Sequence, residues 1–199
     1  MTTFPRTILP NGQSPPTLPG PLFSISDSGK MQTRSTQRVG WTWEETFLFE
    51  WNSAGRLWTA QTEYWFRNGT QLNVAHQGLS LLGSGGGTPL VDGATQTGVS
   101  INTKGWPLST NSVLLAGDII TFANINAVYM VRNGINSDGS GDAAITFNPP
   151  IFAGGSPADE AAITITDSAL FTAKIATFDM PVHGPNYWVA PRITWVEDP

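Results

Sequence analysis

Apolar and polar residues alternate most regularly just after Gly40. In a strand, successive side chains point to opposite faces, so alternation with a period of two predicts a strand with one buried face. Glu45 is the one residue that interrupts the apolar face of this pattern. We therefore predict a half-buried strand that contributes a row of aromatic side chains to the core. That row consists of Trp41, Trp43, Phe47, Phe49 and Trp51.

The spacing of apolar residues changes to that of a helix after Ser53, a residue that suits the N-cap position. Four large side chains recur at i, i+1, i+7 and i+8, and we interpret them as one helix face. The pair Asn68-Gly69 tolerates the left-handed conformation of a helix C-terminus. The pattern predicts one substantial helix, over residues 53–67. Its apolar face is expected to consist of Leu57, Trp58, Tyr64 and Trp65.

Shorter alternating stretches, separated by turn residues, follow the helix. Segment 133–142 is rich in Gly, Asn, Asp and Ser and predicts a loop. Short strands at this spacing are typical of a small barrel or a sandwich. We therefore predict a mainly β protein, a β-sandwich or small β-barrel with one α-helix near 53–67 and an extended N-terminal arm. Further strands are expected at 72–76, 119–123, 128–132, 144–148, 163–166, 173–178 and 187–196.

Residues 1–29 contain six of the fifteen prolines. Proline fixes φ and lacks a backbone donor, so we do not expect this stretch in a helix or a central strand. Two interpretations stay open: a solvated terminus, or an arm laid on a neighbouring subunit. Large apolar side chains favour the arm, because a solvated tail does not need them. The candidate subunit-interface residues are Phe4, Ile8, Leu18, Leu22 and Phe23.

The Gly-rich segment 83–88 is the best candidate for a domain boundary. Pro89-Leu90 follows it, where a phosphate-binding loop would have Lys and then Ser or Thr, so we do not interpret it as such a loop. The chain then divides into three parts. They are an extended Pro-rich arm over 1–29, a strand–helix–strand core domain over 30–83 plus 173–199, and a small barrel-like domain or insertion over 84–172.

Composition narrows the classes of function. Only 13% of the residues are charged and the net charge is −5, which argues against binding to a nucleic-acid backbone, because such binding needs a basic patch. The chain has no Cys, which excludes thiolate nucleophiles, cysteine metal sites and disulfides. No apolar run approaches the ~20 residues of a membrane helix, and the first residues lack a signal-peptide pattern. We therefore expect a soluble chain made inside a cell.

Few residues are arranged for chemistry. His76 and His183 each stand alone, without further ligands at zinc-binding spacing. No Gly-x-Ser-x-Gly motif marks a nucleophile, and Glu44 and Glu50 share the strand face opposite the tryptophans, which favours a solvated face over a glycosidase pair. The loop 138–142 resembles half of a calcium loop, but a plain hairpin loop is favoured. We expect no catalytic residues, no cofactor, no metal and no enzyme activity.

The order of several short motifs is more specific than their chemistry. Val-Asp-Gly-Ala-Thr-Gln-Thr-Gly at 91–98 precedes Lys104-Gly-Trp106 and Leu115-Ala-Gly-Asp118. Tyr129-Met-Val and the run 144–151, which ends Asn-Pro-Pro-Ile, come after them. This ordered set resembles a family of tailed-bacteriophage structural proteins of the tail tip or baseplate. The strand ending Phe-Leu-Phe-Glu-Trp at 47–51, with the helix ending Tyr-Trp-Phe-Arg-Asn-Gly at 64–69, is similar to a unit of phage tail proteins.

The resemblance implies a β-barrel or sandwich that forms a ring around the tail axis and connects the tail tube to distal tail proteins. It implies a homo-oligomer, with a hexamer favoured over a trimer, and neighbours among tail-tube and hub or baseplate proteins. The location it implies is the virion, assembled in the host cytoplasm, with no membrane contact. DNA can pass through such a ring without specific binding, and an acidic lumen would not hold it back. The alternatives are a carbohydrate-binding β-sandwich module that uses exposed aromatic residues and, third, a small hydrolase.

Overall fold

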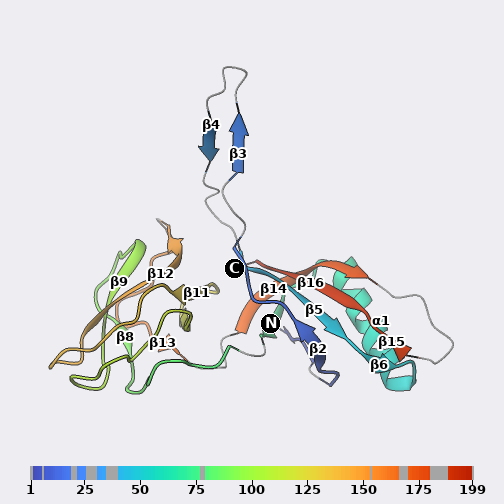
Figure 1. Cartoon of the computed structure of the whole chain (residues 1–199), viewed down its shortest axis with the longest axis horizontal. Coiled ribbons are helices and arrows are strands. Elements are labelled where there is room, and N and C mark those ends of the chain that lie inside the picture. Colours follow the sequence, from blue (N-terminus) through green and yellow to red (C-terminus); the bar gives the residue numbers. More distant parts are fainter. Residues whose placement is uncertain are drawn as a thin grey trace. The chain divides into compact units, whose positions relative to one another are not determined.

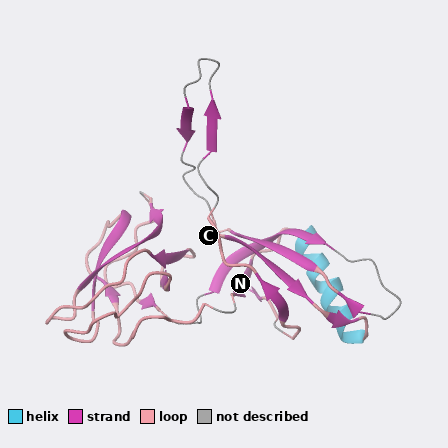
Figure 2. Cartoon of the chain, viewed as in Figure 1, coloured by secondary structure: helices cyan, strands magenta, loops and turns pink. Residues whose placement is uncertain are grey.

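The structure is a computed structural model of the whole chain. It describes residues 2–5, 7–18, 22–25, 31–34, 40–76, 79–152, 154–165, 170–179 and 188–198. The protein is mainly β, as predicted, and the described residues contain one helix (Figure 2). The chain folds into two compact units. The first unit contains Met1–Leu72 and Ala173–Asp198, and the second contains Asn73–Thr172.

A six-stranded sheet forms the framework of the first unit (Figure 1). Its central strands β5 (Thr42–Phe47) and β16 (Arg192–Glu197) are antiparallel and place Trp43 opposite Trp195. The predicted strand after Gly40 is divided at the exposed Leu48 into β5 and the short β6 (Phe49–Glu50), which pairs with β15 (Trp188–Val189). The strand order of the sheet is β1 (Thr2–Thr3), β7 (Leu72–Ala75), β14 (Leu170–Asp179), β16 (Arg192–Glu197), β5 (Thr42–Phe47) and β2 (Pro10–Gln13).

The helix α1 spans Ser53–Arg67, as predicted, and lies against the sheet of the first unit (Figure 1). Asn52, and not the predicted Ser53, is its N-cap, because the Asn52 Oδ1 accepts hydrogen bonds from the amides of Ala54 and Gly55 at 3.0 and 3.1 Å. The helix ends at Asn68, and Gly69 follows in the left-handed conformation with φ +56°. Local sequence therefore determined both ends of the helix to within one residue.

The predicted helix face is only half right. Trp58 and Trp65 are buried, whereas Leu57 and Tyr64 remain 70% and 63% exposed. Neighbouring residues of a helix differ by about 100° in direction, so the pairs 57/64 and 58/65 form two separate stripes. One helix can turn only one of these stripes fully toward the sheet. The stripe of Trp58, Thr62 and Trp65 occupies that position.

The core of the first unit is built from aromatic rings. Phe4 is buried, and its ring centroid lies 5.0 Å from that of Trp195 and 5.7 Å from that of Trp65. Trp58 of α1 packs on Phe47 of β5 at 4.8 Å. Offset and edge-on aromatic pairs at these distances stabilise a core beyond the area that they bury.

The N-terminal segment is not a free arm over its whole length, which corrects the prediction for residues 1–29. β1 and β2 are the two edge strands of the first unit's own sheet. Pro10 begins β2 at the edge, where a missing N–H need not break a ladder. The proline argument therefore excluded central strands correctly but not edge strands.

The strands β3 (Leu22–Ile25) and β4 (Met31–Arg34) form an antiparallel hairpin, and β3 falls within the region that the sequence predicted as the arm. Within the described chain, these two strands pair with each other and with no further strand.

The second unit is a sheet that nearly closes on itself. An isolated bridge between Leu90 and Ala162 joins its two end strands, supported by a 3.0 Å hydrogen bond from the Val91 amide to the Ala161 carbonyl. A nearly closed, barrel-like sheet agrees with the predicted fold class, a β-sandwich or small β-barrel. The strand order is β13 (Ile163–Thr164), β10 (Ile119–Phe122), β11 (Val128–Val131), β12 (Ala143–Ile151), β9 (Gly98–Lys104) and β8 (Leu90–Val91).

The Gly-rich segment 83–88 is an ordered part of the second unit and not the connection between domains that we predicted. The amides of Ser84 and Gly85 each donate to a backbone carbonyl of residues 112–113 at 2.9 Å. Gly87 has φ +71°, and a Cβ there would lie 2.3 Å from the Gly105 carbonyl oxygen. The glycines are therefore needed for close backbone approach, a role that composition does not distinguish from that of a flexible linker.

Candidate functional site

The described residues assign neither histidine to a catalytic group. His76 is buried at the end of β7, with its ring centroid 6.4 Å from that of Phe171. His183 lies outside the described residues. In the described ranges, no group of three or more His, Asp or Glu residues is placed to hold a metal ion.

Glu45 is the most deeply buried carboxylate of the first unit, with no exposed surface. Its Oε2 accepts a hydrogen bond from the Trp195 Nε1 at 2.9 Å, and its Oε1 accepts one from the Gln13 Nε2. Gln13 is directly opposite Glu45 in the register of β2 and β5. Both carboxylate oxygens therefore join the edge strand β2 and the central strand β16 to β5. Sequence marked Glu45 only as a break in the alternation.

Asp118 has the corresponding role in the second unit. This buried carboxylate follows the turn before β10 and accepts hydrogen bonds from three backbone amides. They are the amides of Leu82 at 2.6 Å, Gly83 at 3.1 Å and Leu115 at 2.7 Å. Backbone N–H groups without a partner are costly inside a protein, so Asp118 stabilises the two loops that meet at this end of the barrel.

The Asp138 carboxylate closes the loop at 138–142 into a turn. The Asp138 Oδ1 accepts hydrogen bonds from the amides of Ser140 at 2.8 Å and Asp142 at 2.9 Å. Hydrogen bonds from the backbone of Asp142 and then Ser140 lower the pKa of the Asp138 carboxyl below its ordinary value. The same loop was the calcium candidate in the sequence. Side-chain-to-backbone hydrogen bonds of this kind are typical of an Asx turn.

Exposed ion pairs lie at the surface of both units. Lys104 at the end of β9 contacts Glu160 and Asp92, and hydrogen bonds to these carboxylates, with Glu160 first, raise the pKa of Lys104. In the first unit, Lys174 and then Gln71 donate to Asp198, which lowers the pKa of that carboxyl. Such exposed pairs contribute little to stability, because solvent screens their charges. They are consistent with solvated surfaces.

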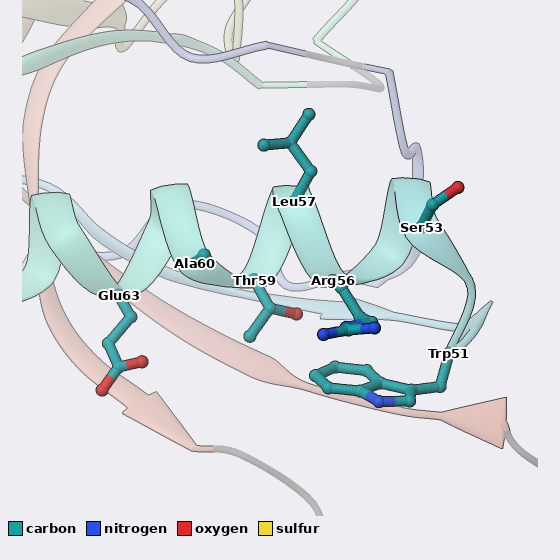
Figure 3. Close-up of a pocket in the computed structure, with 7 residues that line it drawn as sticks. All are labelled: Trp51, Ser53, Arg56, Leu57, Thr59, Ala60 and Glu63. Carbon is teal, nitrogen blue, oxygen red and sulfur yellow. The ribbon is translucent and has the colours of Figure 1, made fainter.

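One hollow, with a volume of about 510 Å³, lies along α1. Arg56, Thr59 and Glu63 point to the same side of the helix, the side on which the indole of Trp51 is drawn (Figure 3). Thr59 is buried, and its hydroxyl has no hydrogen-bond partner among the described residues. The lining combines an aromatic ring, one charge of each sign and a hydroxyl. It consists of Trp51, Ser53, Arg56, Leu57, Thr59, Ala60 and Glu63.

The candidate interface residues of the N-terminal segment have different positions. Phe4 is buried in the core of its own unit, which corrects its assignment to a subunit interface, because two tryptophans of α1 and the Trp195 ring surround it. Ile8 and Leu18 are partly buried. Leu22 and Phe23 belong to β3, and their side chains lie outside the described part of the structure.

Comparison with models of protein families and with curated proteins finds no match for this chain. The helix α1, the one helix in the described ranges, has 15 residues and falls short of what a membrane span requires.

Proposed function

We propose that this chain is a structural subunit of a bacteriophage tail tip or baseplate, which assembles with copies of itself into a ring and connects the tail tube to distal tail proteins. The ordered motifs over 89–151 support this role by their resemblance to tail proteins. The fold of two compact β units is compatible with it.

The observation that carries the proposal is the β3–β4 hairpin. A two-stranded hairpin is at best marginally stable in water when it packs on nothing else. Its outer strand edges offer N–H and C=O groups to another chain. The strands include the apolar residues Leu22, Phe23, Ile25 and Met31 in their sequence. The hairpin, rather than Phe4, thus becomes the element that contacts a neighbouring subunit, with a hexamer favoured and a trimer second.

The buried polar groups also support a structural role. Glu45 and Asp118 direct their carboxylate oxygens to donors of their own unit. Six of the eight tryptophans are buried, so a sugar-binding surface formed by several tryptophans gains no support from the described residues. We therefore do not advance the carbohydrate-binding alternative.

The test replaces residues 19–39 with a short Gly-Ser linker and measures mass by light scattering, with images of the particles by electron microscopy. We expect rings from the natural chain and no rings from the variant, with unchanged far-ultraviolet circular dichroism. Rings of the same mass from the variant would contradict the role of the hairpin. A natural chain that stays monomeric at all concentrations would contradict the ring itself.

A further inference from the structure

The helix α1 carries a second apolar stripe on its exposed side. Leu57 and Tyr64 are 70% and 63% exposed, and the exposed Ala60 lies between them. Residues spaced at i, i+3 and i+7 share one side of a helix. The buried side of the same helix is already occupied by Trp58, Thr62 and Trp65. The exposed stripe therefore has no packing partner among the described residues, although it has the spacing of a helix interface.

The residues beside this stripe have the composition of an interface centre. Trp51 and Arg56 both border the hollow (Figure 3). Together with Tyr64, they are the three residue types that most often dominate binding energy in protein interfaces.

We propose that this face of α1 docks against α1 of a second copy of this chain, antiparallel, about a two-fold axis that passes beside Ala60. Alanine at the centre allows two helices to approach closely, because no long side chain separates their backbones. Leu57 precedes Ala60 by three residues and Tyr64 follows it by four. The two-fold axis therefore places Leu57 of each copy close to Tyr64 of the other.

The charges of Arg56 and Glu63 favour a second copy of this chain as the partner and an antiparallel direction of the two helices. Arg56 lies four residues before Ala60 and Glu63 three residues after it, which at 1.5 Å per residue is about 6 Å and about 4.5 Å along the axis. Antiparallel pairing thus brings Arg56 of each copy beside Glu63 of the other, twice by symmetry. Parallel pairing would instead place the Arg56 side of each helix against the Leu57 side of the other, so neither ion pair would form.

Glu63 also pairs with Arg67 of its own helix at 2.6 Å. That pair is exposed and therefore weak, so it does not prevent a second contact of Glu63 with Arg56 of the other copy.

A contact of this kind is isologous and closes with two copies. It uses α1 and not the β3–β4 hairpin, so it does not rest on the proposed function. Removal of residues 19–39 should leave it intact, which separates its test from the test of the ring.

The absence of Cys from the natural chain allows a direct test with single cysteines. A disulfide needs Cα atoms about 4.4–6.8 Å apart. Ala60→Cys places the two thiols at the axis, whereas Ser53→Cys places them about 21 Å apart, since each lies seven residues from the axis. Both residues are exposed and on the same helix, so Ser53→Cys is the matched control.

We expect Ala60→Cys to form a disulfide-linked dimer at least about ten-fold faster than Ser53→Cys under mild oxidation. A mixture of Ser53→Cys and Arg67→Cys chains should form the mixed dimer in preference to either homodimer, because antiparallel pairing brings these two positions together. Equal cross-linking rates for Ala60→Cys and Ser53→Cys would overturn the proposal. An Ala60→Cys chain that stays monomeric would also overturn it, and would indicate that α1 binds a different protein.

A charge exchange in the Ala60→Cys background tests the ion pairs. Arg56→Glu or Glu63→Arg alone should slow cross-linking several-fold, and the two together should restore it, since both pairs are then reversed. Circular dichroism verifies that each variant keeps its helix. Failure of the double exchange to restore the rate would overturn the antiparallel register.

Discussion

Glu45 shows how one residue can decide the arrangement of a core. It lies on the buried face of β5 among aromatic side chains, where a carboxylate without hydrogen bonds would be strongly unfavourable. The indole N–H of Trp195 and the amide of Gln13 donate to its two oxygens. The polar residue therefore specifies which edge strand and which tryptophan lie beside β5.

Replacement of Glu45 tests this role. Glu45→Leu leaves two buried donors without an acceptor, at about 1–3 kcal/mol each, so we expect the free energy of unfolding to fall by about 2–5 kcal/mol. Glu45→Gln, which keeps an acceptor, should cost less. The measurement is denaturant unfolding followed by tryptophan fluorescence. Glu44→Leu, on the exposed face of the same strand, is the control and should change stability by less than about 1 kcal/mol.

Asp138 predicts a pH dependence. Hydrogen bonds from the backbone of Asp142 and Ser140 lower its pKa in the folded state, so the ionised form stabilises the fold above the ordinary Asp pKa. This stability is lost as the pH falls through the lowered pKa. Asp138→Asn keeps an acceptor but does not titrate. We therefore expect the melting temperature to fall less steeply with acid in Asp138→Asn than in the natural chain, and parallel curves would contradict the assignment.

At the scale of elements, α1 illustrates which properties of a helix are local. Its ends follow from a capping side chain and an Asn-Gly pair within a few residues of the boundary. The side that it buries depends on the sheet, which is assembled from strands at both ends of the chain. The edge strand β2 is a second example, because Pro10 is tolerated in it only since the strand lies at the edge of the sheet.

The N-cap can be tested with two adjacent substitutions. Asn52→Ala removes the acceptor for the amides of Ala54 and Gly55 and should lower the free energy of unfolding by about 0.5–2 kcal/mol. Ser53→Ala removes a hydroxyl from the next position and should change it by less than about 0.5 kcal/mol. Urea unfolding of the full chain measures both. A larger loss of stability from Ser53→Ala than from Asn52→Ala would contradict the assignment of Asn52 as the N-cap.

At the scale of the whole molecule, the chain builds two compact units with separate cores. The aromatic core of the first joins residues from both ends of the chain, for example Phe4 and Trp195. The second unit is continuous in sequence, and the contact between Leu90 and Ala162 closes its sheet. Among the described residues, the core of the second unit therefore contains none from either end of the chain.

This difference predicts independent folding of the second unit. We expect the fragment of residues 79–165 to unfold cooperatively on heating, with a strand-type circular dichroism spectrum, because its core and its sheet closure are internal. Ile120→Ala, at a fully buried position of that core, is the control and should lower the stability by about 2–5 kcal/mol. A fragment without a cooperative transition would show that the barrel depends on the rest of the chain.

The sequence alone determined the local features of this protein. Alternation predicted the strands around Trp43, and the change of period predicted a helix over 53–67, because both signals are contained in a few neighbouring residues. Turn-rich composition indicated a mainly β fold. The two stripes of α1 were also visible, but as a single face, so sequence could not separate the core stripe from the exposed stripe of the candidate interface.

Only the tertiary structure decided what depends on residues far apart in the chain. Phe4 enters the core because Trp65 and Trp195 leave space for its ring. The Gly-rich segment 83–88 is ordered because residues 112–113 accept its amide hydrogens. Burial, edge position and sheet closure are properties of the assembled surfaces, whereas periodicity reports only which residues of one element can share a face. For this reason the helix was predictable, and the partner that each of its sides meets was not.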